Sequence, residues 1–148
     1  MRNKGHEFKA GRVTYYYDGV HLWYMLPSGR VLNYPFAKFD AEGNVTYAKA
    51  AWKPAADAKE WPRARLWKGL SCENITQAAA NDLLRHSLRE FDQAGLGTVL
   101  HVHDEVVIET DKPEEVSEIM QKIMCTPPAW AEGLPLDIEV QTMTRYGK

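Results

Sequence analysis

Apolar and polar residues alternate along the first third of the chain. After the Asp18-Gly19 pair, residues 20, 22, 24 and 26 are apolar or aromatic and share one face, while His21, Trp23 and Met25 share the other. A period of two residues is typical of a β-strand with two different faces. Turn signals follow at residues 27–29 and 42–44. The pattern predicts a β-meander over residues 12–47, after a poorly ordered lead-in at residues 1–10.

A helical period appears after a connection at residues 51–70, which contains Pro, Ala and Trp and has no sustained period. We expect Ser71 to cap a helix that ends before Gly95, a residue suited to the left-handed position after a helix. One face of this helix is apolar and is expected to pack on the hairpin described below. That face comprises Ala80, Leu83, Leu84, Leu88 and Phe91.

A second helix is predicted with Asp111 as its cap and Pro113 in its first turn. Its apolar stripe contains Val116, Ile119, Met120, Ile123 and Met124. The methionines favour core filling over a binding surface. A turn at Gly133 leads to a final predicted strand at residues 136–140.

The elements together predict an α+β fold, with an antiparallel sheet, helices on one face and a β-rich N-terminal subdomain. We therefore divide the chain into a subdomain at 1–50, the connection at 51–70 and a second domain at 71–148.

Between the two helices, an acidic pair lies between two apolar, β-branched runs. Residues 99–102 and 106–108 predict two short, mostly buried strands, with His103, Asp104 and Glu105 at the tip of the hairpin. Two adjacent carboxylates repel each other and raise the free energy of the fold unless they bind a cation. Their oxygens suit a hard divalent metal such as Mg²⁺. An ordinary acidic turn is an equally good interpretation from these residues alone.

The first helix also carries a polar stripe, formed by Asn74, Gln77, Asn81 and Arg85. A solvated helix face is the simplest interpretation, but such faces are usually rich in Lys and Glu, and this one begins with three amides. Amides can donate to the acceptors that every base pair presents in the minor groove of DNA. The stripe therefore also suits contacts that check base-pair geometry without reading sequence.

Aromatic residues concentrate in the predicted meander, namely Tyr15, Tyr16, Tyr17, Trp23, Tyr24 and Tyr34. Exposed rings can stack on nucleic-acid bases. A small meander, however, needs large side chains to build a core. Cross-strand packing is therefore the favoured interpretation.

Bulk properties exclude several classes of protein. The 148 residues carry a formal net charge of −2, so no overall basic character indicates a nucleic-acid partner. Cys72 and Cys125 are too few for a disulfide framework and have no CxxC spacing. No apolar run approaches membrane-spanning length, and the N-terminus lacks a secretory pattern. We expect a cytoplasmic protein with no membrane partner.

Several motifs in order resemble one enzyme family. Residues 73–84 read ENITQAAANDLL and residues 102–105 read VHDE, while LPSGR at residues 26–30 is followed by Leu32 and Tyr34. Near the C-terminus come PAWA at 128–131, GLPL at 133–136 and RYGK at 145–148. These strings resemble the C-terminal part of family A DNA polymerases, most closely the bacteriophage-type branch, from about residue 20 to the end. The VHDE hairpin corresponds to motif C of that family.

The resemblance implies a palm-like sheet and a reaction. Family A polymerases use two divalent metals to activate the primer 3′-hydroxyl and stabilise the leaving pyrophosphate. Asp104 matches the motif C carboxylate that binds Mg²⁺, Glu105 is a weaker candidate for direct ligation, and His103 matches the residue that contacts the primer terminus. Gln77, followed by Asn74, matches the positions that contact primer–template DNA. Many family members have arginine at the position of Asn81, which puts phosphate contact from that turn in doubt.

The chain lacks the motif A strand with its second aspartate and the motif B helix that holds the incoming nucleotide. We therefore expect no polymerisation by the chain alone, which starts with Met1 and could be a separately encoded piece, a prophage remnant or an expressed fragment. Either it is the catalytic-carboxylate part of a polymerase completed by another polypeptide, or it is a noncatalytic palm-like DNA-binding module. An independent metal nuclease is a poorer hypothesis, because no other carboxylates converge on the hairpin.

An uncovered hairpin edge further predicts self-association or a partner strand, unless the meander covers it.

Overall fold

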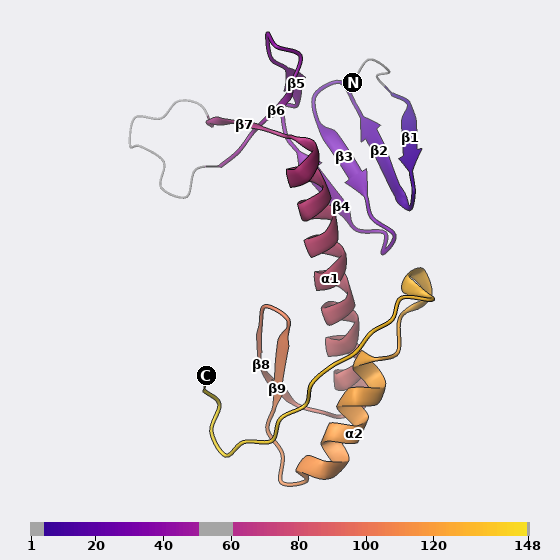
Figure 1. Cartoon of the computed structure of the whole chain (residues 1–148), viewed down its shortest axis with the longest axis vertical. Helices are drawn as coiled ribbons and strands as arrows, with labels where there is room; N and C mark the ends of the chain where they lie inside the picture. The colour runs from indigo at the N-terminus through magenta and orange to yellow at the C-terminus, as the bar shows by residue number, and fades with distance from the viewer. Residues whose placement is uncertain (1–4, 51–60, 148) are drawn as a thin grey trace. The chain divides into compact units, whose positions relative to one another are not determined.

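The computed structural model describes residues 5–50 and 61–147 and shows the expected α+β fold (Figure 1). Antiparallel strands form three separate sheets, and the two main helices are α1 (Lys68–Gln93) and α2 (Pro113–Met124). A short 3₁₀ helix, η1, spans Ala129–Ala131. The chain forms two compact units, Met1–Gln77 and Ala78–Lys148, whose boundary falls within α1.

The first sheet of the N-terminal unit is an antiparallel meander in the order β1-β2-β3-β4. Its strands are β1 (Glu7–Ala10), β2 (Val13–Tyr17), β3 (Leu22–Met25) and β4 (Val31–Tyr34). The predicted meander is confirmed, but the expectation of a poorly ordered lead-in is wrong for residues 7–10. These residues pair with β2, with Glu7 opposite Tyr16 and Ala10 opposite Val13, and their alternation of polar and apolar residues over four positions fits this strand. Residues 1–4 lie outside the described residues.

The turn between β2 and β3 is organised by the carboxylate of Asp18. Its Oδ1 atom accepts the backbone N–H groups of Val20 at 2.8 Å and His21 at 2.6 Å, and its Oδ2 atom accepts the indole N–H of Trp23 at 2.9 Å. An Asx turn of this kind explains why Asp-Gly marks the end of a strand. The backbone hydrogen bond from His21, with the bonds from Trp23 and Val20, lowers the pKa of Asp18 to about 2.

Tyrosine rings that pack in tilted or edge-to-face pairs form the core of the N-terminal unit. The ring centroids of Tyr15 and Tyr24 are 4.5 Å apart, those of Tyr24 and Tyr34 are 4.8 Å apart, and those of Tyr34 and Tyr47 are 5.1 Å apart. The buried Val13 and Leu66 complete this cluster, and Leu70 and Ile75 from α1 pack against it. Cross-strand packing of Tyr15, Tyr24 and Tyr34 is therefore confirmed.

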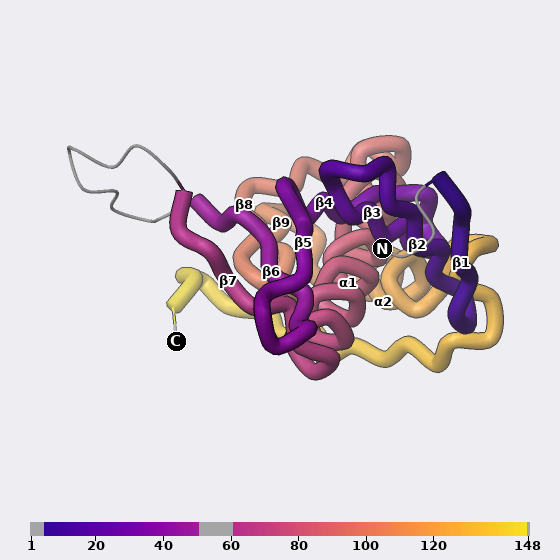
Figure 2. The backbone as a smooth tube through the Cα atoms, turned by 90° about the horizontal axis from the view of Figure 1, so that it is seen from above, coloured from indigo at the N-terminus to yellow at the C-terminus, as the bar shows by residue number. Residues whose placement is uncertain are grey.

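A second sheet in the same unit has the order β5-β6-β7 (Figure 2). Its strands are β5 (Lys38–Phe39), β6 (Val45–Ala48) and β7 (Arg63–Arg65). The second half of the expected connection at residues 51–70 contains β7 and the start of α1, while residues 51–60 lie outside the described residues. The strand at β7 is short and flanked by Pro62, and its pairing with β6 supplies the order that the local pattern lacks.

Helix α1 begins three residues before the expected cap. The backbone N–H of Ser71 already donates to the carbonyl of Trp67 at 3.0 Å, and the Ser71 hydroxyl donates to the Tyr24 hydroxyl at 3.1 Å. The prediction of Ser71 as N-cap is therefore wrong, because a distant strand takes its side chain. The predicted helix end is confirmed: Gly95 has φ +74°, its N–H donates to the Asp92 carbonyl, and the Leu96 N–H donates to the Phe91 carbonyl. These two bonds form a Schellman motif.

In the C-terminal unit, the remainder of α1 buries a mixed set of residues. Leu84 and Phe91 are buried as expected, and Phe91 is fully buried at 0% exposure, but Ala80 is exposed and does not belong to the buried face. Leu83 and Leu88 are half-buried. Asp82 and Ser87 are buried although both are polar, and neither was assigned to the core from the hydrophobic pattern.

Helix α2 begins at Pro113, as the proline signal predicts, but its N-cap residue is Lys112 rather than Asp111. Thr110 takes the expected role of Asp111 in ordering this turn, since its hydroxyl oxygen accepts the Lys112 N–H at 3.0 Å. Val116 is buried and the rest of the predicted stripe is half-buried.

The segment 136–140 is not a strand, so that prediction is wrong. Leu136, Ile138 and Val140 are half-buried and alternate with two exposed residues, but no strand in the described ranges pairs with them. Alternating burial therefore does not require membership of a sheet. Within the described residues, no helix is both long enough and apolar enough to cross a membrane.

Candidate functional site

The acidic motif occupies the tip of an isolated hairpin in the C-terminal unit. Strand β8 (Thr98–Val102) pairs with β9 (Glu105–Ile108), and the register places Val102 opposite Glu105, so the turn contains only residues 103 and 104. A two-residue turn requires a positive φ in at least one of its central residues. His103 has φ +55°, a left-handed conformation that few residues other than glycine adopt.

The three predicted site residues differ in exposure. His103 and Asp104 are exposed, and Glu105 is half-buried. The hydroxyl of Tyr146 donates a hydrogen bond of 2.8 Å to Oε2 of Glu105. Tyr146 belongs to the RYGK string, and no periodicity in the sequence could have indicated this contact. The hairpin therefore presents one carboxylate to solvent and holds the neighbouring one with a phenol.

The strands of this hairpin are less buried than expected. On β8, Val99 is 59% exposed, Leu100 41% and Val102 36%, whereas the residues of β9 are half-buried. A register shift between Thr98 and Leu100 marks a bulge at Val99. The prediction of mostly buried strands is wrong for β8, because no other described strand pairs with the edges of this two-stranded sheet.

The donor set at the tip suits a hard divalent metal but does not complete its shell. Asp104 and Glu105 offer carboxylate oxygens, the ligands that Mg²⁺ prefers, and an exposed carboxylate leaves room for metal-bound water. Across residues 5–50 and 61–147, no three or more His, Cys, Asp or Glu side chains gather as a metal site. Mg²⁺ takes six ligands in octahedral geometry, so two carboxylates would have to be supplemented by water, substrate or further protein groups.

The polar stripe of α1 begins in the N-terminal unit, where its first two amides differ in environment. Asn74 is half-buried, and its side-chain N–H donates to the Tyr34 hydroxyl at 3.0 Å. Burial raises the pKa of that phenol, so Tyr34 stays protonated at physiological pH. Gln77 is exposed and makes only a long contact of 3.4 Å with the Glu73 carboxylate. Asn81 and Arg85, farther along the stripe, are also exposed.

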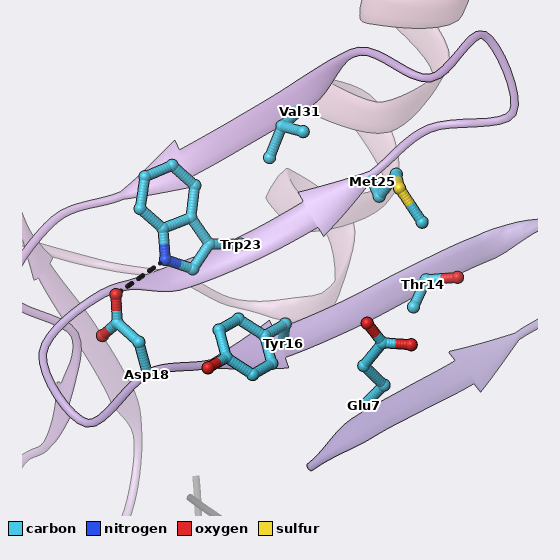
Figure 3. A pocket seen from close by; sticks show the side chains of 7 residues that line it. All are labelled: Glu7, Thr14, Tyr16, Asp18, Trp23, Met25 and Val31. Carbon is cyan, nitrogen blue, oxygen red and sulfur yellow. Dashed lines mark hydrogen bonds between the residues drawn. The ribbon is translucent and has the colours of Figure 1, made fainter. Parts of the chain in front are cut away.

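A shallow hollow of about 450 Å³ lies on the first sheet, on the face opposite the tyrosine core (Figure 3). Glu7, Thr14, Tyr16, Asp18, Trp23, Met25 and Val31 line it. Tyr16 and Trp23 are direct cross-strand partners, and the Trp23 indole is held by Asp18. No site was predicted on this face, because the aromatic residues of the meander form one set in the sequence pattern.

The chain is similar to a DNA polymerase of bacteriophage origin. The relative is the DNA polymerase of Bacillus phage SP02, which is 35% identical to this chain over 136 residues. The aligned region makes up 92% of this chain but 21% of that polymerase, so the chain spans about a fifth of the relative's length. No protein-family model matches the chain, and no solved structure matches it.

Proposed function

We propose that this chain supplies the motif C segment of a family A, bacteriophage-type DNA polymerase and acts in nucleotidyl transfer onto a DNA primer. The observation that carries the proposal is the similarity to the phage SP02 DNA polymerase over nearly the whole chain. The exposed acidic tip of the β8–β9 hairpin supports it, because the segment that would hold a catalytic metal is accessible. The assignment of this fold to part of a palm domain belongs to the same proposal.

Asp104 is the metal-binding carboxylate in this proposal, and Glu105 is the secondary one. Asp104 is exposed at the tip, whereas Glu105 is half-buried and already accepts a hydrogen bond from Tyr146. When bound, Mg²⁺ would supply Lewis-acid stabilisation of the attacking and leaving oxygens. The chain's own contribution is to fix the Asp104 carboxylate beside His103, whose imidazole can donate a hydrogen bond to an oxygen at the primer terminus.

The amides of α1 are proposed to contact primer–template DNA. Gln77 is the stronger candidate because it is exposed and only weakly held, so its amide can turn toward a base acceptor. Asn74 is the weaker candidate, since binding DNA would require its amide to give up the hydrogen bond to Tyr34.

The partner in this proposal is polymerase sequence that carries motifs A and B, the source of the second aspartate and of the nucleotide-binding helix. The incomplete metal set of the described residues supports the need for such a partner. The same observation also favours a second candidate function, a noncatalytic palm-like module that binds DNA without chemistry. We expect the purified chain alone to show no Mg²⁺-dependent primer extension.

A hybrid enzyme tests the proposal. The chain replaces the matching segment of the phage SP02 DNA polymerase, and Mg²⁺-dependent primer extension is measured. The hybrid is expected to extend primers, and Asp104→Ala should lower its rate by several orders of magnitude, as expected for a lost metal ligand. Asp111→Ala, which removes an exposed carboxylate outside the hairpin, is the matched control and should remain active. A hybrid that folds and binds DNA but does not extend primers supports the noncatalytic module instead.

A further inference from the structure

The two units of the chain carry opposite charges, although the whole molecule is nearly neutral. The N-terminal unit has 12 Lys and Arg against 7 Asp and Glu, a formal charge of +5, and the C-terminal unit has 6 against 13, a formal charge of −7. The net charge of −2 conceals this separation. Charge asymmetry between parts of a chain is a sign of interaction with a polyanion such as nucleic acid. The basic part is not the part that contains the acidic hairpin.

Within the N-terminal unit, the sheet β5-β6-β7 has one apolar face and one basic face. Val45, Tyr47 and Leu66 belong to the tyrosine core, so they define the covered side. The register aligns Lys38, Thr46 and Arg65 across the three strands on the other side. Arg63 lies two residues from Arg65 on β7 and therefore points to the same side, about 7 Å farther along the strand. Lys38, Arg63 and Arg65 are all exposed.

Hydrogen bonds hold both guanidinium groups over this face. Arg63 donates to the carbonyl of Phe36 and to the Thr46 hydroxyl, each at 2.8 Å. Arg65 donates from Nη2 to the side-chain oxygen of Asn44. A guanidinium has five N–H donors, so these bonds fix the orientation of each group and leave donors for an outside acceptor. An ordered guanidinium with spare donors suits bidentate recognition of a phosphate.

The acidic residues beside this face accept hydrogen bonds within their own turn, and Asp40 also interacts electrostatically with Arg65. Asp40 accepts the backbone N–H groups of Glu42 at 3.0 Å and Asn44 at 2.8 Å, and the Asn44 amide also donates to Asp40 and to Glu42. Both carboxylates lie in the turn between β5 and β6, at one end of the sheet. Over residues 36–49 and 61–68 together, five basic residues stand against these two acidic ones. The net charge of this sheet and its flanks is therefore positive.

We propose that the outer face of β5-β6-β7, formed by Lys38, Arg63 and Arg65, binds the phosphate backbone of DNA as a contact surface separate from the β8–β9 hairpin. The choice of DNA as the polyanion rests on the proposed polymerase function, whereas phosphate as the chemical group recognised rests on the charges and the guanidinium geometry. The contact is sequence-independent, because phosphate contacts position a duplex without reading its bases. This basic face would allow a chain with a net charge of −2 to bind a polyanion.

The test measures binding of the full chain to a fluorescent DNA duplex by anisotropy at several salt concentrations. Three phosphate contacts predict a slope of log K against log salt of about −2.7. The variant Lys38→Gln/Arg65→Gln should weaken binding about tenfold per lost contact at 0.1 M salt and reduce the slope by about 2 units. Arg63 is replaced only by Lys, because its two hydrogen bonds also hold the sheet together.

The matched control is Arg89→Gln/Lys122→Gln, which removes one Arg and one Lys from exposed positions of the C-terminal unit. Circular dichroism establishes that each variant is folded at the assay temperature. Loss of binding in the sheet variant with retention in the control supports the proposal. Equal binding by both folded variants, or a wild-type slope near zero, overturns it. An inactive hybrid polymerase whose DNA binding still depends on Lys38 and Arg65 would refute the proposed function and leave this inference standing.

Discussion

The hydroxyl of Tyr146 donates a 2.8 Å hydrogen bond to the Glu105 carboxylate, which lies 41 residues earlier in the chain. This bond ties the C-terminal segment to the first residue of β9, beside the turn that carries Asp104. It also distinguishes two adjacent carboxylates that are alike in sequence, since one is restrained and the other is exposed. The difference leads to the first prediction.

Tyr146→Phe removes the hydroxyl donor and leaves the ring. We expect a loss of stability below about 1 kcal/mol, because the bond is at an exposed position where water can replace it. In the hybrid polymerase we expect at most a tenfold lower extension rate, far less than for Asp104→Ala. Thermal melting and primer extension measure the two effects. A loss as large as that of Asp104→Ala would contradict this prediction and show that activity requires Glu105 to be held by Tyr146.

The two amides of α1 are expected to differ in their effects on stability. Asn74→Ala leaves the hydroxyl of the buried Tyr34 without its amide partner and should lower the free energy of unfolding by about 1 kcal/mol. Gln77→Ala should change it by no more than about 0.5 kcal/mol, as is typical of surface substitutions, while impairing extension by the hybrid enzyme. Denaturant unfolding compares the pair directly. A large loss of stability in Gln77→Ala would identify it as a structural residue.

Acid should weaken the turn between β2 and β3. Hydrogen bonds from His21, Trp23 and Val20 lower the pKa of Asp18 from its ordinary 3.8 to about 2. A lowered pKa in the folded state stabilises the fold fully above the unfolded value, and this contribution is lost as the pH falls from about 4 to about 2. Asp18→Asn should therefore lose less stability than the wild type across this window.

The fluorescence of the tryptophans, Trp23 among them, can follow this acid titration, because the Asp18 carboxylate accepts the Trp23 indole N–H. Asp111→Asn, at an exposed position outside this turn, serves as the control and should titrate like the wild type. Identical acid profiles for Asp18→Asn and the wild type would show that the three hydrogen bonds are not held in solution.

The exposed edge of β8 predicts association. Unpaired strand edges beside apolar side chains recruit further strands, and the meander forms its own sheet rather than pairing with this hairpin. We expect the free chain to self-associate or swap elements at micromolar concentration, and Val99→Lys to reduce this. Met143→Lys changes a residue that is 47% exposed and outside the strands, so it is the control. Sedimentation velocity measures the association state, and hydrogen exchange measures the protection of the hairpin amides. A wild-type monomer with rapidly exchanging hairpin amides would contradict the prediction.

Local signals predicted those parts of the fold that depend on neighbouring residues. Gly95 ends α1 because a left-handed residue completes the hydrogen bonds of the last turn, and Asp18 marks a turn because its carboxylate bonds to the next backbone groups. The tip position of His103 and Asp104 followed from two β-branched runs with a polar interruption, whereas Glu105, also expected at the tip, is the first residue of β9 and pairs with Val102. Each of these features can be inferred within a window of a few residues.

The features that were predicted wrongly or missed each depend on a residue far along the chain. Ser71 has the chemistry of an N-cap, but its hydroxyl bonds to Tyr24, and the helix begins earlier. Residues 7–10 alternate polar and apolar side chains over only four positions and form a strand through pairing with β2. The contact between Tyr146 and Glu105 and the common basic face of Lys38 and Arg65 depend on tertiary structure and strand register.

The left-handed backbone at His103 has a consequence for how this turn can vary. A residue with a Cβ atom pays roughly 1–2 kcal/mol for this conformation, whereas glycine adopts it without that cost. A glycine at position 103 would therefore make the hairpin more stable and would remove its imidazole. At this one residue, selection for thermal stability and selection for a hydrogen-bonding side chain beside Asp104 favour different amino acids.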